Sequence, residues 1–258
     1  MTILQVAGVS KRFGGLQALT NVTFDLPAGQ VLGLIGPNGA GKTTVFNVIN
    51  GVYTPEEGRI IFRDRDVTGE KPFHLARMGL ARTHQIVRPL NELTVRKNVM
   101  AGACFGREYR SLREAGQIAD EVLEFVGLAK HSQQLASSLN VAEKKRLELA
   151  RALAARPFLL LLDEVLAGLN PSEIAIMVEA IRGVRNQGVS IIMIEHVMQA
   201  TMSVSDRMIV LDYGQQIAEG TPAEIAKDQR VIEAYLGKPE YAAKLIGSVQ
   251  GNGNTPSP

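Results

Sequence analysis

Short apolar runs alternate along the chain with longer stretches of helical periodicity. Continuous or alternating apolar runs are typical of strands, whereas apolar residues at steps of three and four are typical of helices. The predicted strands are 3–9, 19–26, 31–35, 58–62, 158–162, 189–194, 207–211 and 216–218. The predicted helices are one that ends near Gly51, then 94–103, 118–126, 141–155, 171–186 and a short one after Thr221.

The order of these elements predicts an α/β fold with a parallel sheet, because strands that alternate with helices are joined by crossover connections. We expect a single domain over residues 1–246, in which a core of about 1–87 and 156–236 is interrupted by a helical insertion of about 88–155. Residues 247–258 are rich in Gly, Asn, Ser and Pro, and we expect them to form a disordered tail.

Composition narrows the class of protein. Of the 258 residues, 45% are apolar, which is enough for a substantial core. The net charge of +2, with no basic tract, lacks the electrostatic signature of a nucleic-acid-binding protein. The single Cys104 excludes an internal disulfide and fits a reducing compartment. The sequence has no signal peptide and no apolar run long enough to span a bilayer, so we expect a cytoplasmic protein that reaches a membrane only through a partner.

A glycine-rich loop between a strand and a helix is the strongest chemical signal in the chain. It follows the apolar run 31–35 and fits the pattern G-x-x-x-x-G-K-[ST]. Such a loop aims main-chain N–H groups and the positive end of a helix dipole at one point, where phosphate oxygens bind. We predict that Lys42 reaches the β- and γ-phosphates of a nucleotide and that the Thr43 hydroxyl binds Mg²⁺. The predicted nucleotide-binding residues of the loop are Gly36, Pro37, Asn38, Gly39, Ala40, Gly41, Lys42, Thr43 and Thr44.

Two further strands end in groups suited to triphosphate cleavage. Four leucines at 159–162 lead into Asp163 and Glu164. We predict that Asp163 holds Mg²⁺ and that Glu164 polarises the attacking water. A solvated acidic pair is the alternative, and the phosphate loop favours the catalytic interpretation. His196 follows the strand 189–194, and we predict that its imidazole contacts the γ-phosphate, the alternative being an ordinary histidine at a strand end.

These motifs follow the order seen in the ABC ATPases, which the chain resembles from about Leu4 to Gly237. The resemblance implies a P-loop NTPase (RecA-like) core with N-terminal antiparallel β strands and an inserted helical subdomain. It also implies that Phe13 stacks on adenine, as an aromatic face can, and that Gln85 links Mg²⁺ to the membrane subunits. A Phe packed in an edge strand is the alternative for Phe13. The segment after Gln85 would contact the membrane partner, and the loop 167–170 would contact a second subunit.

Segments at 10–16, 81–85, 167–171 and 194–196 resemble most closely the ATPase subunit of branched-chain amino-acid importers. This implies ATP and Mg²⁺ as cofactors, hydrolysis coupled to import of branched-chain or related amino acids, and a place on the inner face of the cell membrane. The implied partners are two permease subunits, a second ABC ATPase subunit and, indirectly, a periplasmic or extracellular solute-binding protein. We expect the second ATPase to be a different chain, with a homodimer left open, and no nucleic acid.

Two other functions of an ABC ATPase are considered. One is a non-transport enzyme that acts on nucleic acid or ribosomes, which the absence of a second cassette, a long coiled-coil insertion and a basic patch disfavours. The other is a regulatory cassette with weak turnover, which Glu164 and His196 disfavour. Urea, short amides and other amino acids stay open as transported substrates, because specificity resides in the other subunits.

The chain departs from the family in the signature that precedes the long helix 141–155. ABC ATPases usually have Leu-Ser-Gly-Gly-Gln there, and these residues touch the γ-phosphate held by the other subunit. Here Leu139 is followed by the aligned signature residues Asn140, Val141, Ala142 and Glu143. Asn140 is a good N-cap, and Glu143 completes a capping-box pattern. We therefore predict that this helix start satisfies its own N–H groups.

An altered signature has consequences for the ATP site to which it would contribute. Fewer donors remain for the phosphate, and a carboxylate about 5 Å away would repel it by roughly 1–3 kcal/mol, enough to slow the site about tenfold. We expect the cations at 144–146 to form a solvated helix face. The hypothesis is an asymmetric dimer, in which the site on this phosphate loop is competent and the site on this signature is slow or silent. The alternative is that main-chain N–H groups suffice whatever the side chains.

Overall fold

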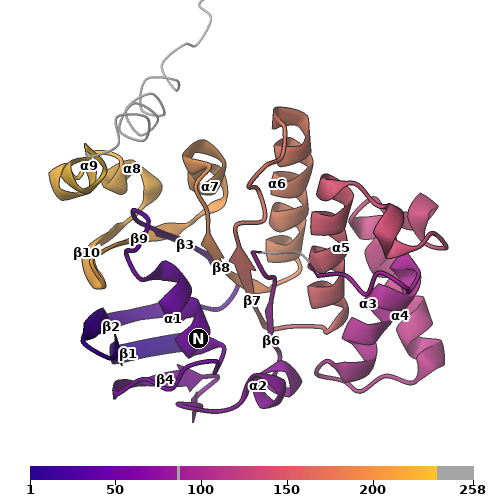
Figure 1. Cartoon of the computed structure of the whole chain (residues 1–258), viewed down its shortest axis with the longest axis horizontal. Helices are drawn as coiled ribbons and strands as arrows, with labels where there is room; N and C mark the ends of the chain where they lie inside the picture. The colour runs from indigo at the N-terminus through magenta and orange to yellow at the C-terminus, as the bar shows by residue number, and fades with distance from the viewer. Residues whose placement is uncertain (86–87, 237–258) are drawn as a thin grey trace, which may run out of the picture.

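A six-stranded sheet runs through the centre of the computed structural model, which describes residues 1–85 and 88–236 (Figure 1). Its strands in spatial order are β10 (Gln215–Gly220), β9 (Arg207–Asp212), β3 (Val31–Ile35), β8 (Ser190–Ile194), β7 (Leu159–Asp163) and β6 (Leu80–Arg82). All neighbouring pairs are parallel except β10 with β9. The predicted parallel sheet is confirmed. The predicted disordered tail 247–258 lies outside the described residues.

Both faces of this sheet are covered, which explains why its inner strands β3, β8 and β7 are buried along their whole length and almost entirely apolar. In β7, Leu160 and Leu162 pack into one hydrophobic core, whereas Leu159 and Leu161 pack into a second core. Successive side chains of a strand point to opposite faces, so the run of leucines fills both cores. The strand is thereby held from two sides, and so are the residues that follow it.

An antiparallel sheet covers one of these faces together with α1 (Lys42–Ile49). Its strands in spatial order are β2 (Leu16–Pro27), β1 (Thr2–Phe13), β4 (Glu57–Phe62) and β5 (Arg65–Asp66). The implied antiparallel N-terminal strands are confirmed. The hairpin of β1 and β2 is longer than predicted, because its far end is mostly exposed and has no apolar pattern to detect.

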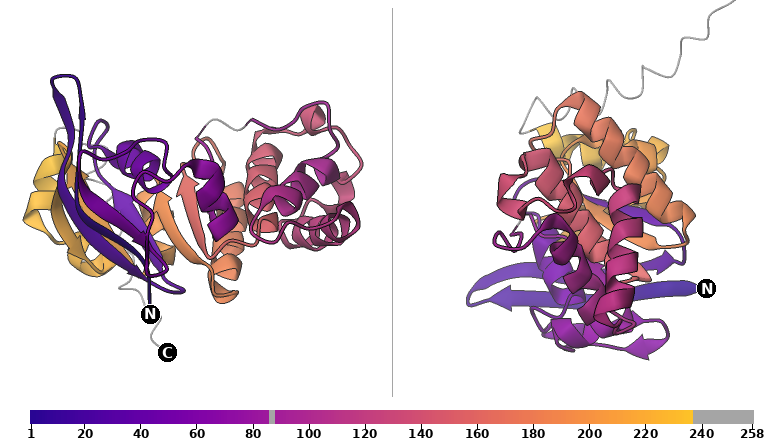
Figure 2. Two further views of the ribbon diagram at one scale, coloured as in Figure 1. Left: turned by 90° about the horizontal axis from the view of Figure 1, so that it is seen from below. Right: turned by 90° about the vertical axis from the view of Figure 1, so that its right-hand side faces the viewer.

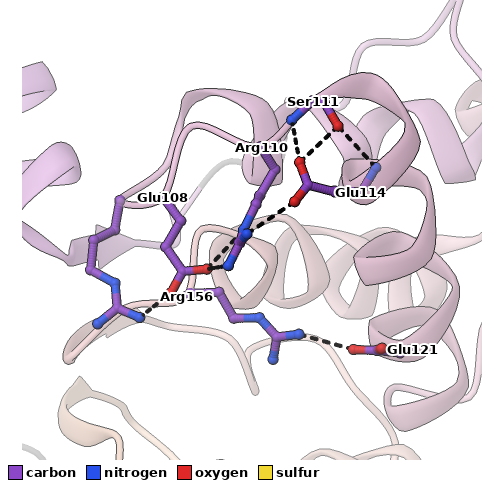
Figure 3. A network of polar contacts seen from close by, with 7 residues as sticks. Glu108, Arg110, Ser111, Glu114, Glu121 and Arg156 are labelled. Carbon is purple, nitrogen blue, oxygen red and sulfur yellow. Dashed lines mark hydrogen bonds and ion pairs between the residues drawn. The ribbon is translucent and has the colours of Figure 1, made fainter.

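Three helices form a separate layer at the end of the molecule opposite the β1–β2 hairpin (Figure 2). They are α3 (Val95–Phe105), α4 (Leu112–Phe125) and α5 (Val141–Ala154), with short 3₁₀ turns at Ala129–His131 and Ala136–Ser138. Arg96 of α3 and Asp120 of α4 form an ion pair of 2.7 Å. The connection from α3 to α4 is braced by hydrogen bonds from Arg110 to Glu108 and Glu114, and the Ser111–Glu114 capping box begins α4 (Figure 3).

The remaining helices pack around the central sheet. The helix α6 (Pro171–Asn186) and the capping box that begins α8 (Pro222–Ile225) are confirmed as predicted. The sequence did not predict α2 (Pro72–Met78), α7 (Met198–Val204), α9 (Gln229–Leu236) or the strand β6. These helices have seven or eight residues, too few for a periodic pattern to stand out.

Candidate functional site

The topology of the central sheet brings the sequence motifs to one edge. The strands β3, β8, β7 and β6 are neighbours and parallel, so their carboxyl ends lie side by side. The phosphate loop follows β3, His196 follows β8, the two acids are at the end of β7, and Gln85 follows β6. Open α/β sheets bind ligands at this edge.

The phosphate loop depends on glycine at two of its positions. Gly36 has φ 150°, and a Cβ there would lie 2.1 Å from the Leu211 carbonyl oxygen. Gly41 has φ 100°, in the left-handed region, and a Cβ there would lie 2.8 Å from the Ala18 carbonyl oxygen. Gly41 is also the N-cap of α1, which therefore has no side-chain cap. The first-turn N–H groups of α1 are left to an anionic ligand.

Lys42 lies inside the loop and is 7% exposed. Its Nζ donates hydrogen bonds to the carbonyl oxygens of Gly36 (2.7 Å) and Pro37 (2.9 Å). A cavity of about 580 Å³ opens beside it and is lined by the loop residues 38–44, Phe13, Gln85, Glu164 and His196. The structure therefore brings the predicted loop and four other predicted residues together around one cavity.

The carboxylate of Glu164 is held on both oxygens. Gln85 Nε2 donates a hydrogen bond to Oε2 at 2.8 Å, and His196 Nε2 lies 2.9 Å from Oε1. The main chain of Glu164 is left-handed, with φ 51°, which is uncommon for a residue with a side chain. In this structure Gln85 and His196 thus contact the glutamate. Their predicted contacts with Mg²⁺ and phosphate stay predictions.

Asp163 is 2% exposed and pairs with a residue that the sequence analysis passed over. Its Oδ2 accepts a hydrogen bond of 2.8 Å from Arg82, which also donates to Asn47 at 2.7 Å. Its Oδ1 is buried and accepts no hydrogen bond within the described residues. An orphaned carboxylate oxygen near a threonine hydroxyl suits a hydrated Mg²⁺. Asp163 and Thr43 both line a second cavity of about 750 Å³, so these donors fit the predicted cation.

Phe13 stands at the edge of the first cavity, at the end of β1. Its side chain is 42% exposed, and its ring packs edge-on against Tyr53 with the centroids 5.0 Å apart. Lys11 Nζ lies 5.3 Å from the centroid of the ring. Phe13 therefore sits partly outside the core, where a ring could stack on a base, and adenine stacking stays a prediction.

The predicted signature residues lie apart from this cavity, at the start of α5. The Asn140 N–H donates to Glu143 Oε2 at 2.9 Å, and the Glu143 N–H donates to Asn140 Oδ1 at 2.9 Å. The predicted capping box is therefore confirmed. Val141 is 62% exposed, whereas Ala142 is buried. Glu143 also lies 3.4 Å from Nε2 of His131.

One expectation about α5 is wrong. Lys145 does not belong to a solvated helix face: it is 8% exposed, and its Nζ donates a hydrogen bond to the main-chain oxygen of Glu164 at 2.7 Å. Its charge favoured a solvated position, although its helical step, three residues after the buried Ala142 and four before the buried Leu149, places it on the inner face of α5. Burial lowers the pKa of the Lys145 ammonium, while Glu195, Glu148 and Glu164 act in the opposite direction.

Two buried glutamates flank the acidic strand end. Burial raises the pKa of Glu195 to about 7, although its carboxylate accepts a hydrogen bond of 2.7 Å from the Leu166 N–H. Burial also raises the pKa of Glu148 to about 7, against the opposing effect of a hydrogen bond from the His84 N–H. No sequence motif marks these two residues. Only the packing of β7, β8 and α5 buries them.

Comparison with known proteins fits this geometry. Residues 19–167 match the family model described as ABC transporter, and residues 215–241 match that of the branched-chain amino acid ATP-binding cassette transporter. The high-affinity branched-chain amino acid transport ATP-binding protein LivG of Escherichia coli (strain K12) is 41% identical over 250 residues, which cover 92% of this chain and 98% of LivG. The corresponding protein BraF of Pseudomonas aeruginosa is 39% identical over the same shares of both chains.

Solved structures give the same likeness. A nucleotide-free ATP-binding cassette from an ABC transporter superposes with a TM-score of 0.83 at 30% identity, covering 92% of this chain and all of that one. An ABC transporter cassette in its ADP conformation superposes with a TM-score of 0.82, also at 30% identity and with the same coverage. These likenesses confirm the predicted fold class. Within residues 1–85 and 88–236, the structure has no helix long and apolar enough to cross a bilayer.

Proposed function

Because the chain belongs to the ABC transporter family of ATP-binding subunits, we propose that it hydrolyses ATP to drive import of branched-chain or related amino acids through separate permease subunits. The chain is an ATPase of that family. The amino-acid substrate rests on the names of relatives such as LivG and BraF. The single observation that supports hydrolysis best is the carboxylate of Glu164, which is held on both oxygens at the rim of the phosphate-loop cavity.

The phosphate loop is proposed to grip the triphosphate of ATP. The uncapped N-terminus of α1 offers main-chain N–H groups, and Lys42 offers an ammonium that the triphosphate would draw from the carbonyl groups of Gly36 and Pro37. Thr43 and Asp163 would hold Mg²⁺, with Gln85 as a further predicted ligand. When bound, Mg²⁺ would neutralise charge on the β- and γ-phosphate oxygens.

Glu164 is proposed to polarise the attacking water. A general base must be aimed at the proton that it accepts, and Gln85 and His196 restrict the rotation of this carboxylate from opposite oxygens. His196 is proposed to contact the γ-phosphate in the loaded state.

A membrane partner is proposed to dock beside Gln85. The cavity of about 750 Å³ lies between the core strands and the helical layer, and residues on both sides line it, among them His84, Gln85 and Phe105. Phe105 is 75% exposed at the rim of this cavity, and its apolar side chain would be buried by a docked permease helix. Residues 86 and 87 of the expected contact segment lie outside the described residues. The chain is thereby proposed to lie on the inner face of the membrane.

A second, different ATPase subunit is proposed to complete the ATP sites. The capping box at Asn140 uses the N–H of Glu143 and places the carboxylate of Glu143 beside the helix start. A phosphate brought there by the partner would find fewer donors and a like charge. A heterodimer would leave one fully competent site, built from this phosphate loop and the signature of the partner.

The experiment replaces Glu164 with Gln in the transporter assembled with its partner subunits. We expect hydrolysis at the ATP site built on this phosphate loop to fall by about 100-fold or more, the usual contribution of a general base, while ATP binding persists. Phosphate release and retention of labelled ATP measure the two properties. Glu179→Gln, a change at an exposed site on α6, is the matched control and should behave as the parent. Hydrolysis equal to that of an active parent would refute Glu164 as the base, whereas background hydrolysis in both proteins would refute the proposed motor and favour a regulatory cassette.

A further inference from the structure

Lys145 occupies a position where a lysine is seldom found. It lies in the second turn of α5, is 8% exposed and has lost most of the water that an ammonium prefers. Its Nζ donates a hydrogen bond of 2.7 Å to the main-chain oxygen of Glu164. Across residues 1–85 and 88–236, this is its single side-chain hydrogen bond, and it forms no ion pair. A buried cation is thus aimed at one peptide group.

That peptide group belongs to a residue with an uncommon main-chain conformation. Glu164 has φ 51°, a conformation that persists only where its surroundings hold it. Its N–H donates to the Ile194 carbonyl oxygen at 2.9 Å, which ties it to β8. Its own oxygen accepts from Lys145 at 2.7 Å and from the Ala167 N–H at 3.3 Å. The hydrogen bond from Lys145 is therefore the shorter of the two that the Glu164 carbonyl oxygen accepts.

Nearby buried carboxylates attract Lys145 but do not hold it in an ion pair. Glu195 and Glu148 lie close enough to influence it, but each accepts a hydrogen bond from a main-chain N–H instead, of Leu166 and His84 respectively. Neither forms an ion pair with Lys145 within the described residues. The ammonium is therefore placed for the carbonyl group of Glu164.

We infer that Lys145 is a positioning residue for Glu164, which fixes the peptide from which the catalytic carboxylate projects and ties it to the start of α5. The direction of a side chain follows from its main-chain angles, so a shift of this peptide would move the carboxylate away from Gln85 and His196. This inference rests on the proposed role of Glu164.

The link also joins two surfaces of the molecule. The helix α5 begins with the signature residues 140–143, and Lys145 follows two positions later. The helix α5 therefore connects two sites. Its start is proposed to meet the nucleotide held by the other subunit, and its Lys145 contacts the main chain of Glu164, the proposed base of this subunit. A displacement of the helix start on dimer closure would be passed to Glu164.

The test compares Lys145→Met, which keeps the length and loses the donor, with Lys145→Arg, which keeps both charge and donor. In the assembled transporter we expect Lys145→Met to lower kcat for ATP about tenfold with KM and ATP affinity within twofold of the parent. Lys145→Arg should recover at least half of the parent kcat. Hydrogen exchange should accelerate at the amides of residues 165–167 in the Met variant. Lys144→Met removes the same charge one residue earlier and should keep the parent kcat.

The outcomes separate this inference from the proposed function. If Glu164→Gln abolishes hydrolysis and Lys145→Met keeps the parent kcat, the positioning role is refuted and the motor stands. If Glu164→Gln leaves the hydrolysis of an active parent unchanged, the proposed role of Glu164 itself fails. A loss of kcat and ATP affinity in equal proportion, without rescue by Arg, would show a structural lysine only. Should Lys145→Met not fold, Lys145→Gln is measured against the same criteria.

Discussion

Two helix starts in this molecule present their first-turn N–H groups differently. The helix α1 begins at Gly41, which has no side chain to cap it, and a cavity of about 580 Å³ opens in front of its N–H groups. The helix α5 begins at Asn140, whose side chain and the carboxylate of Glu143 form a closed capping box. Both helices have the same dipole and the same unsatisfied first-turn donors. Their side chains decide whether these donors serve a ligand or the helix itself.

Each kind of helix start has a disadvantage: α1 loses some stability, and α5 binds an anion less well. With glycine as its N-cap, α1 gives up a few tenths of a kcal/mol that a capping side chain would supply, and a bound anion would offset this loss. A closed capping box stabilises the apo state and makes the same end a poorer anion site. The comparison therefore supports the proposal that this chain contributes a strong ATP half-site and a weak one.

The largest effect, on ATP affinity, is expected from removing Lys42, the cation at the uncapped start of α1. Lys42→Ala should lower the affinity for ATP by about 10- to 100-fold, because hydrogen bonds to charged groups contribute about 1.5–3 kcal/mol each. Titration calorimetry with MgATP measures it. Lys227→Ala, an exposed change beyond α8, is the control. Equal ATP affinity in Lys42→Ala and the control would show that Lys42 does not contribute to ATP binding, and would contradict the proposed role of the start of α1.

A smaller effect, on ATP turnover, is expected from removing the capping box at the start of α5. Replacing residues 140–143 by Ser-Gly-Gly-Gln should raise ATP turnover of the assembled transporter, by up to about tenfold at the site that uses this signature. Presteady-state phosphate release resolves the two sites of the dimer. Turnover that stays at the parent level at both sites would mean that main-chain N–H groups suffice, and the proposed asymmetry would be wrong.

The smallest effect concerns stability alone. Asn140→Ala should destabilise the fold by about 1 kcal/mol, the usual contribution of an N-cap. Ser111→Ala removes the same kind of capping box from α4, far from any ATP site, and should cost about as much (Figure 3). Urea unfolding measures both. A negligible loss in Asn140→Ala beside a clear loss in Ser111→Ala would show that the cap of α5 contributes nothing to the folded state.

The sequence by itself determined which functional residues follow which strands. The phosphate loop, Asp163, Glu164 and His196 each follow an apolar run, and a continuous apolar run has few solutions other than a buried strand. The capping box at Asn140 was also predictable, because capping is a local interaction between residues three apart. Local patterns thus identified the parallel strands other than β6, the long helices, the phosphate loop, Asp163, Glu164 and His196, whereas Phe13 and Gln85 were inferred from the family resemblance.

The tertiary structure alone decided which groups hold these residues in place. Arg82 on Asp163, Lys145 on the main chain of Glu164, and the buried Glu148 and Glu195 are pairings or burials set by distant segments. A lysine in a helix has the same local pattern whether it faces water or a carbonyl group. Its environment depends on how α5 packs against β7 and β8. That packing sums many weak contacts across the chain, so no short stretch of sequence encodes it.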